Sequence, residues 1–500
     1  MFKEKSKYKP LIIALYAVAF VFFAFKMFFY SQYVARFPDE IQHISYIAYL
    51  EKTHAIIPDF KNMTFLVQNN GQITSSTNLN LVNLEKIGQN YTFGDSFNYL
   101  GHPPLYYDLM LLSRAVQVHG STVTVHIFRL RCFSMALSSL AMLLVLYIGL
   151  SRVGKNPFLH GLYAAISVSV PMLAYDSAGI NNDACALLGV SVFLLGLLRF
   201  SERKRNYGTY LLVGSGVLVA FLSKLTTGTI VLVSLFLFCV LSIIKEKSAR
   251  FILSKQFLVS LPAYAITAAY YLAVYLQTGS LQPTYARLNP QGFYQSGFYV
   301  APQNRSHMDF FAYTAFYFKK FWGSWTGIGS YITSGRAGSL LSVNRIAVFA
   351  LMVLPILLLF QYKRGRKNSF AQTALICVYA GVVCTAVIQW LRAFHEYANV
   401  SGYMGGFQSR YYLCAISALA LAVPFVLKNC LKDQPVTVII RKVRSMIWPQ
   451  ANYAAAAQTV PDKVRVNYRV IGFSCICLAY SGLLIYEDFI YFLIHFKSYF

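Results

Sequence analysis

Long apolar runs separated by short polar segments are the dominant pattern of this 500-residue chain. An apolar run of about 20 residues crosses the hydrocarbon core of a bilayer as a helix. The first run, Leu11–Tyr30, is longer than the core of a signal peptide and lacks a small-residue cleavage site, so we expect it to be retained. Further runs follow at Phe128–Leu150, Phe158–Tyr175, Asn182–Phe200, Thr209–Leu222, Thr227–Ile244, Gln256–Gln277, Arg345–Phe360, Phe370–Leu391, Arg410–Leu427 and Val470–Phe492. The pattern predicts an all-α polytopic membrane protein with about eleven, and up to about thirteen, transmembrane helices.

Basic residues gather in alternate loops, which gives the predicted helices an orientation. Of the 44 lysines and arginines, 26 fall in the N-terminal segment and in every second loop. Since cytoplasmic loops carry an excess of Lys and Arg, we expect the N-terminus to be cytoplasmic. Topology and contact with anionic lipids account for most of the net charge of +26, so nucleic-acid binding is not needed to explain it. Only 12% of the residues are charged, against roughly 25% in soluble domains.

The opposite side of the membrane is predicted to carry the large loops. These are segments 31–127, 278–344 and 392–409, and they are rich in aromatic residues. Loops of more than about 15 residues are usually functional or disordered, and here the aromatic content favours folded structure. We expect short surface helices in the first loop and an interfacial helix at His307–Thr326.

Two carboxylates stand immediately after the first predicted helix, in segment 36–43 (RFPDEIQH). Because proline is pre-organised for the first turn of a helix, Asp39 and Glu40 are predicted to open a surface helix over Ile41–Lys52. One interpretation is that Asp39 only stabilises the N-terminus of this helix electrostatically. A second carboxylate is unnecessary for that purpose. The other interpretation is that Asp39 is a base that takes a proton from a hydroxyl group.

Further polar and basic residues are predicted on the same side of the membrane. His102 precedes two prolines in segment 98–107 (NYLGHPPLYY), which also contains Tyr106. A simpler interpretation is that His102 only packs in this turn, and that each basic residue only extends toward lipid head groups. The charged candidates at the outer ends of later helices and in the later outer loops are Asp183, Lys224, Lys319, Lys320 and Arg410. Taken together, the basic residues among them would form a cationic cluster that suits a phosphate group.

Motifs of several other protein classes are absent from the sequence. It contains no P-loop, no strand–GxGxxG–helix pattern, no HExxH and no GxSxG. No ionisable residue falls near the middle of a predicted span, apart from Lys26 toward the outer end of the first. Proton-coupled transporters normally place such residues at mid-membrane. A glycolipid or polysaccharide transporter or flippase, and a non-catalytic membrane scaffold, are kept as alternatives to an enzyme.

The order of these motifs and their predicted side resemble those of GT-C glycosyltransferases. The shared features are Pro-Asp-Glu after the first helix, His-Pro-Pro-Leu-Tyr-Tyr before the second, Arg-Leu-Arg at 129–131, Asn-Asn-Asp-Ala at 181–184 and Ser-Lys-Leu-Thr at 223–226. Segments 320–325 (KFWGSW) and 408–411 (QSRY) resemble uncharacterised bacterial multipass proteins within that group. The group includes protein mannosyltransferases and the aminoarabinose transferase of lipid A, and it uses polyprenyl- or dolichyl-phosphate-linked sugars.

The resemblance implies a GT-C-like transmembrane catalytic region over residues 1–430. A basic cytoplasmic loop at 431–469 and a last transmembrane helix with a tail at 470–500 would follow. The implied reaction is an inverting transfer of a sugar from a polyprenyl-phosphate-linked donor to a hydroxyl group of a glycan, lipid or protein. It would take place on the outer face of the plasma (inner) membrane, among membrane lipids and without nucleic acid.

The resemblance also implies roles for the candidate residues. Asp39 would be the base, and Glu40 would support it. Lys224, Arg410, Lys319 and Lys320 would hold the donor phosphate, where negative charge develops on the leaving group. His102 would orient Asp39 or contact the acceptor, and Asp183 and Tyr106 are further candidates for substrate binding. Because no D-x-D motif occurs, no cofactor is assigned, and a divalent cation is left open.

Overall fold

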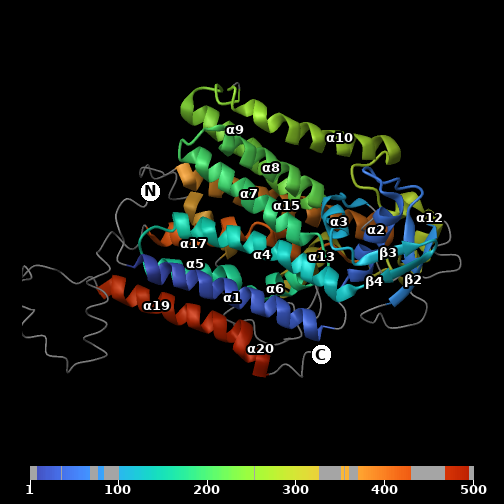
Figure 1. Cartoon of the computed structure of the whole chain (residues 1–500), viewed down its shortest axis with the longest axis horizontal. Coiled ribbons are helices and arrows are strands. Elements are labelled where there is room, and N and C mark those ends of the chain that lie inside the picture. The colour runs from blue at the N-terminus through green and yellow to red at the C-terminus, as the bar shows by residue number, and fades with distance from the viewer. Residues whose placement is uncertain are drawn as a thin grey trace, which may run out of the picture.

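The helices run side by side along one direction, and a small β-sheet lies at one end of them (Figure 1). We call this end of the bundle the sheet end. The arrangement is that of a multi-pass α-helical membrane protein, as the apolar runs predict. The computed structural model describes residues 8–34, 37–67, 77–83, 101–252, 254–325, 351–353, 355–359, 370–428 and 468–494.

Six helices in the described part of the chain are long and apolar enough to cross a membrane. A further span consists of α5 (Pro157–Val168) and α6 (Pro171–Ala178), which are bent by 51° at the break between them. Pro171 has no amide hydrogen with which to continue α5, and it suits the first turn of α6. The six are α1 (Lys9–Tyr33), α4 (Ile127–Arg152), α7 (Asp183–Ser201), α9 (Leu225–Glu246), α10 (Leu261–Thr278, preceded by the 3-10 turn Phe257–Ser260) and α15 (Phe370–His395, followed by the π-helical turn Glu396–Ser401).

Other predicted apolar runs coincide with helices that do not meet the same criteria. Three of these are α8 (Tyr207–Ser223), α17 (Ile416–Lys428) and α19 (Tyr468–Ile485). The run Arg345–Phe360 is described, and helical, at 351–353 and 355–359. The described part therefore has six or seven clear spans where the sequence predicts about eleven. Helices α8 and α17 are short for a span, and the run Arg345–Phe360 is described only in part. Residues 431–467 of the predicted cytoplasmic loop lie outside the described residues, and its last two positions belong to α19.

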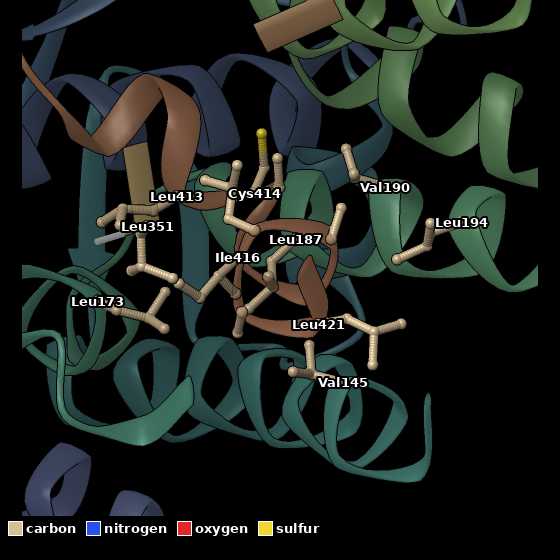
Figure 2. Packing of buried hydrophobic residues seen from close by; sticks show 14 of the residues in the cluster. Val145, Leu173, Leu187, Val190, Leu194, Leu351, Leu413, Cys414, Ile416 and Leu421 are labelled. Atoms are coloured by element: carbon tan, nitrogen blue, oxygen red, sulfur yellow. The ribbon is translucent and has the colours of Figure 1, made fainter. Parts of the chain in front are cut away.

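Helix α7 lies in the interior of the bundle. It is buried along almost its whole length, and α4, α8, α15 and α17 pack around it. A helix that is apolar on every face belongs in such a position. Ile416 of α17 and Leu187 of α7 belong to the same buried apolar cluster (Figure 2). On another side, a Cβ added at Gly216 of α8 would lie 2.5 Å from the backbone nitrogen of Phe193, so only glycine permits this close approach. This packing fixes α7, which begins at the sheet end.

A four-stranded antiparallel sheet forms part of the first loop. The β3–β4 hairpin pairs His119 with Thr122 and turns at Gly120, whose φ of +63° favours glycine. The sheet corrects the prediction that this loop contains surface helices alone. Alternation of valine with polar residues over 116–125 is the sequence signal that predicts this hairpin. The strands are β1 (Thr64–Val67), β2 (Thr77–Asn83), β3 (Val116–His119) and β4 (Thr122–Val125), in the order β1-β2-β4-β3.

Two helices of the first loop pack together at the sheet end. They are α2 (Glu40–Thr53) and α3 (Leu105–Leu111), and α2 also packs on β1 and β3. Helix α2 is buried from Glu40 to Leu50, so it is a core helix and not the surface helix predicted over Ile41–Lys52. Its N-terminus is held rigidly, which suits the precise placement of residues there.

The second loop contributes a helix that supports the charged site described below. This is α13 (Phe310–Ser324), and its start is capped by Asp309, whose Oδ1 accepts a 2.8 Å hydrogen bond from the amide of Ala312. The helix predicted at His307–Thr326 is therefore present. At its other end, Oγ of Ser324 accepts a 2.9 Å hydrogen bond from the amide of Ser409, just before α16 (Arg410–Leu413). Two short helices precede α13, α11 (Tyr285–Leu288) and α12 (Pro290–Tyr294).

Candidate active site

Asp39 precedes α2 in an unusual backbone conformation. Its φ is +67°, in the left-handed region that residues other than glycine seldom adopt. Although Asp39 is the N-cap residue of α2, its side chain makes no capping hydrogen bond. Instead, Oδ2 accepts a 2.8 Å hydrogen bond from Nη2 of Arg410, and 21% of the side chain stays exposed. The backbone thus directs the carboxylate to Arg410, which contradicts a purely capping role.

Arg410 lies at the centre of the site, with only 4% of its side chain exposed. Besides Asp39, its guanidinium faces two buried carboxylates. Nη1 lies 3.9 Å from Oδ1 of Asp176 and 3.9 Å from Oδ2 of Asp183. Its Nε donates a 2.6 Å hydrogen bond to Oε1 of Gln408. Arg410 therefore joins the start of α2 to α6 and α7, and Asp176 is a partner to which the sequence analysis gave no role.

Lys224 supplies a second buried cation. It is extended (φ −162°, ψ 130°) at the junction of α8 and α9. Its Nζ donates a 2.5 Å hydrogen bond to Oδ1 of Asp183 and lies 4.7 Å from the centre of the Tyr411 ring. The other oxygen of Asp183 has no hydrogen-bond partner in the described part of the chain. Asp183 thus lies between Lys224 and Arg410, and the structure brings all three together with Asp39.

A chain of uncharged polar side chains links the elements that carry the charged residues. Nδ2 of Asn182 donates to Nδ1 of His102 at 2.8 Å and to the carbonyl oxygen of Ser223 at 2.7 Å. The hydroxyl of Tyr107 lies 3.0 Å from Nδ1 of His43 and 3.5 Å from Nδ1 of His102. This chain ties α2 and α3 to the start of α7 and to the end of α8. His43, Tyr107 and Asn182 are members that the sequence analysis did not assign.

The two histidines of this chain are uncharged near neutral pH. Burial is the main cause, and it lowers the pKa of both His43 and His102 well below the usual value. The positive charges of Arg410 and Lys224 lower both pKa values further. Because the side-chain nitrogen of Asn182 only donates, Nδ1 of His102 must be the unprotonated acceptor. A proton on that nitrogen would break the bond to Asn182.

Glu40 pairs with a cation outside the Arg410 group. Its two carboxylate oxygens accept hydrogen bonds from Arg131 of α4, at 2.8 Å from Nε and 2.7 Å from Nη2. Nη1 of Arg131 also donates to the carbonyl oxygens of Ser31 and Val34, at 3.0 and 2.8 Å. The buried pair fastens the end of α1 to the start of α2. Glu40 therefore has a structural partner in Arg131 and supports Asp39 through the backbone. Its predicted catalytic role stays a prediction.

Three further candidates lie apart from the charged group. The hydroxyl of Tyr106 donates to Oγ of Ser134 at 3.2 Å, and the residue is fully buried. On α13, Lys319 is exposed and Lys320 is half-buried, with its Nζ 5.7 Å from the centre of the Phe316 ring. The hydrogen bonds and ion pairs of the described residues do not join these three to Arg410. Their roles in substrate binding stay predictions.

The balance of charges at the site bears on metal binding. Three carboxylates, of Asp39, Asp176 and Asp183, face the two cations Arg410 and Lys224. Within the described ranges, no three His, Cys, Asp or Glu side chains are arranged to hold a metal ion. In this arrangement the carboxylates are directed at Arg410 and Lys224. A divalent cation at the site stays an open question, as in the sequence analysis.

Comparison with known proteins finds similarity to solved structures. No protein-family model matches this chain, and no curated protein matches it. The chain is similar to a crystal structure of ArnT from Cupriavidus metallidurans bound to undecaprenyl phosphate, with a TM-score of 0.45 and 11% identity over 95% of this chain and 71% of that one. It is also similar to ArnT from the same organism in the apo state, with a TM-score of 0.44 and 13% identity over 95% and 70%.

Proposed function

We propose that this protein is a membrane glycosyltransferase that transfers a sugar from a polyprenyl-phosphate-linked donor to a hydroxyl group of a glycan, lipid or protein. The observation that carries the proposal is the pairing of Asp39, a partly exposed carboxylate, with the buried Arg410. Through Asp183, Arg410 is also close to a second buried cation, Lys224. Such a carboxylate can accept a proton from a hydroxyl group. Buried arginine and lysine stabilise charge that develops on a phosphate. The groups needed for both halves of the reaction therefore occur in one cluster.

Asp39 acts as the base in this proposal. It takes the proton of the acceptor hydroxyl while the hydroxyl oxygen attacks the anomeric carbon of the sugar. The bond from that carbon to the phosphate oxygen breaks, and its electron pair leaves with the polyprenyl phosphate. Attack on the face opposite the leaving group inverts the configuration at the anomeric carbon. Arg410 and Lys224 stabilise the negative charge that grows on the phosphate.

The geometry of Arg410 supports a role in binding the phosphate. Its contacts with Asp176 and Asp183, at 3.9 Å, are ion pairs longer than hydrogen bonds. A phosphate oxygen that approaches Nη1 therefore competes only with these longer contacts, while Nη2 keeps its bond to Asp39. A guanidinium keeps its charge even when buried, so Arg410 stays positive beside the phosphate. The acidic partners hold the cations in place before the substrate arrives, which is the preorganisation that stabilises a transition state.

We further propose that the sheet end faces away from the cytoplasm. The opposite end carries the basic turns between α4 and α5 and between α7 and α8, where Arg152 pairs with Glu202. Arg205 pairs with Glu246 at the same end. Lys and Arg favour the cytoplasmic side, so this end would face the cytoplasm together with the N-terminus. The protein would lie in the plasma (inner) membrane, with the prenyl chain of the donor among the lipids.

Glycan and lipid profiles of cells with and without this chain test the proposal. We expect one acceptor to carry an additional sugar only in cells that contain the chain. The wild-type gene should restore that sugar in deleted cells, and the Asp39→Asn variant should not. Full restoration by Asp39→Asn would instead favour a non-catalytic scaffold. Movement of an unmodified glycolipid across the membrane, with no new glycosidic bond, would favour a transporter.

A further inference from the structure

A buried ion pair joins the first helix to the C-terminal part of the chain. Lys26 of α1 pairs with Asp488, which lies in the π-helical turn Tyr486–Ile490 after α19, and neither side chain has any exposed surface. Helix α1 continues to Tyr33, so Lys26 lies about 10 Å below its end at a rise of about 1.5 Å per residue. Ionisable residues at such depth are costly and are usually functional. The reaction proposed above gives this pair no role.

Lys26 also contacts the break between α5 and α6. Its Nζ donates a 2.6 Å hydrogen bond to the carbonyl oxygen of Val168, the last residue of α5. The last carbonyl groups of a helix lack partners within that helix, and Pro171 has no amide hydrogen to offer. Lys26 therefore caps α5 at the point where the chain bends by 51° into α6.

Helix α6 leads from this bend to the charged site. Asp176 on α6 lies 3.9 Å from Nη1 of Arg410. Its neighbour Tyr175 packs edge-on against Tyr30, with 5.7 Å between the ring centres. Tyr30 is one helical turn beyond Lys26 on α1. The same face of α1 therefore contacts both the bend and the helix that carries Asp176.

The C-terminal helix supplies the charge that keeps this arrangement together. Helix α19 packs against α5 and runs along the edge of the bundle beside α1 (Figure 1). Without Asp488, Lys26 would be a buried charge with no opposite charge beside it, which is strongly destabilising. The bond from Lys26 to Val168 thus depends on a residue far away in the sequence.

We propose that Lys26 and Asp488 are positioning residues for the Arg410 site. The pair fixes the bend between α5 and α6 and thereby holds Asp176 opposite Arg410. The C-terminal helix is then required for the geometry of the site, although it contributes no group to it. The expected change in donor binding rests on the proposed function. The expected change in the motion of α6 rests on the fold alone.

The test replaces the ion pair by apolar side chains. Lys26→Met combined with Asp488→Leu leaves no buried charge unpaired, so we expect an unfolding temperature close to that of the wild type. Amide hydrogen exchange over α6 is expected to become about tenfold faster, because α5 has lost its cap. Binding of undecaprenyl phosphate, measured in detergent, is expected to weaken about tenfold, because the contact between Asp176 and Arg410 is no longer held in place.

Two controls separate positioning from general stability. Lys26→Arg keeps a cation that can donate to both Asp488 and Val168, and it should behave as the wild type. Arg205→Met combined with Glu246→Leu removes an ion pair at the opposite end, and it should leave exchange over α6 and binding unchanged.

A charge-conserving variant keeps the test decisive if the double variant does not fold. Asp488→Glu retains the counter-charge of Lys26 but adds one methylene group, so it should displace Lys26 from Val168 and speed exchange over α6 by a smaller factor. Wild-type exchange over α6 in every folded variant of the pair would overturn the proposal. Failure of the wild-type protein to bind undecaprenyl phosphate would count against the proposed glycosyltransferase instead, because the exchange measurement does not depend on it.

Discussion

Asp39 combines a strained backbone with a carboxylate that points away from its own helix. Its φ of +67° is one that asparagine also adopts readily, so Asp39→Asn keeps the backbone while it removes the base. We expect this variant to fold and to lose about 10²–10⁴-fold in transfer rate. Initial rates at saturating donor measure this, with Asp59→Asn, an exposed aspartate of the same loop, as the control. Loss of the base would lower the rate by far more than about threefold. A rate within about threefold of the wild type would therefore mean that Asp176 or Asp183 acts as the base instead.

Arg410 differs from a residue that only extends toward lipid head groups, because four side-chain oxygens surround it. Lysine keeps the charge but cannot contact several partners in one plane. Arg410→Lys should therefore lower the transfer rate by about tenfold or more, as expected for a charge-assisted bond of about 1.5–3 kcal/mol. Arg129→Lys, an exposed change near the same end of the bundle, should have no effect. If Arg410→Lys transferred the sugar as fast as Arg129→Lys, the guanidinium of Arg410 would be dispensable.

At the scale of secondary-structure elements, the Glu40–Arg131 pair joins α1, α2 and α4. Glu40→Gln leaves the guanidinium of Arg131 buried without a full counter-charge. We expect a loss of stability of about 3–5 kcal/mol, as for other broken buried pairs. Thermal unfolding of the purified protein measures it, and adding Arg131→Met should recover part of the loss. An unchanged unfolding temperature for Glu40→Gln would show that the pair does not hold these elements together.

The chain from α2 through α3 to α7 depends on neutral histidines. Folding lowers the pKa values of His43 and His102. Below about pH 6.5, the usual pKa of histidine, these two side chains therefore bind more protons in the unfolded chain than in the folded protein. Stability should therefore be full above about pH 6.5 and fall as the pH drops, by up to about 1.4 kcal/mol per pH unit for each histidine. Unfolding temperatures measured between about pH 8 and about pH 5 check this.

Two substitutions identify the source of this pH dependence. His102→Asn offers an amide oxygen that accepts from Asn182 and does not titrate, so it should weaken the loss of stability in acid. His119→Asn changes an exposed histidine on β3 and should not. If His102→Asn shows the same loss in acid as the wild type, other groups cause it.

Elements with strong periodic signals could be predicted, and elements defined by tertiary context could not. Apolar runs match the six clear spans and the α5–α6 pair to within a few residues, because a membrane span needs a long apolar segment. The hairpin 116–125 is short, and its alternation lies inside a loop where only helices were expected. The burial of α2 depends on the sheet that covers it, and so it could not be read from the sequence of α2 itself. The prediction of a surface helix over Ile41–Lys52 is wrong for that reason.

At the scale of the whole molecule, the identity of charged residues was predictable but their pairing was not. The order of motifs placed Asp39, Asp183, Lys224 and Arg410 on one side, and the fold brings them together. The contacts that decide their roles join residues far apart in the chain, such as Arg131 with Glu40 and Lys26 with Asp488. A single sequence contains no local signal for such pairs.

The orientation of the whole bundle gives the last prediction, because it decides on which side the site opens. Asn62 lies exposed in the turn before β1 at the sheet end, and Lys204 lies exposed in the basic turn between α7 and α8. In intact cells, a membrane-impermeant thiol reagent should label Asn62→Cys and should leave Lys204→Cys unlabelled until the membrane is opened. The unmodified protein provides the background from its own cysteines. The reverse labelling pattern would place the sheet end in the cytoplasm, and the proposed transfer on the outer face would then be wrong, whatever the activity of the purified protein.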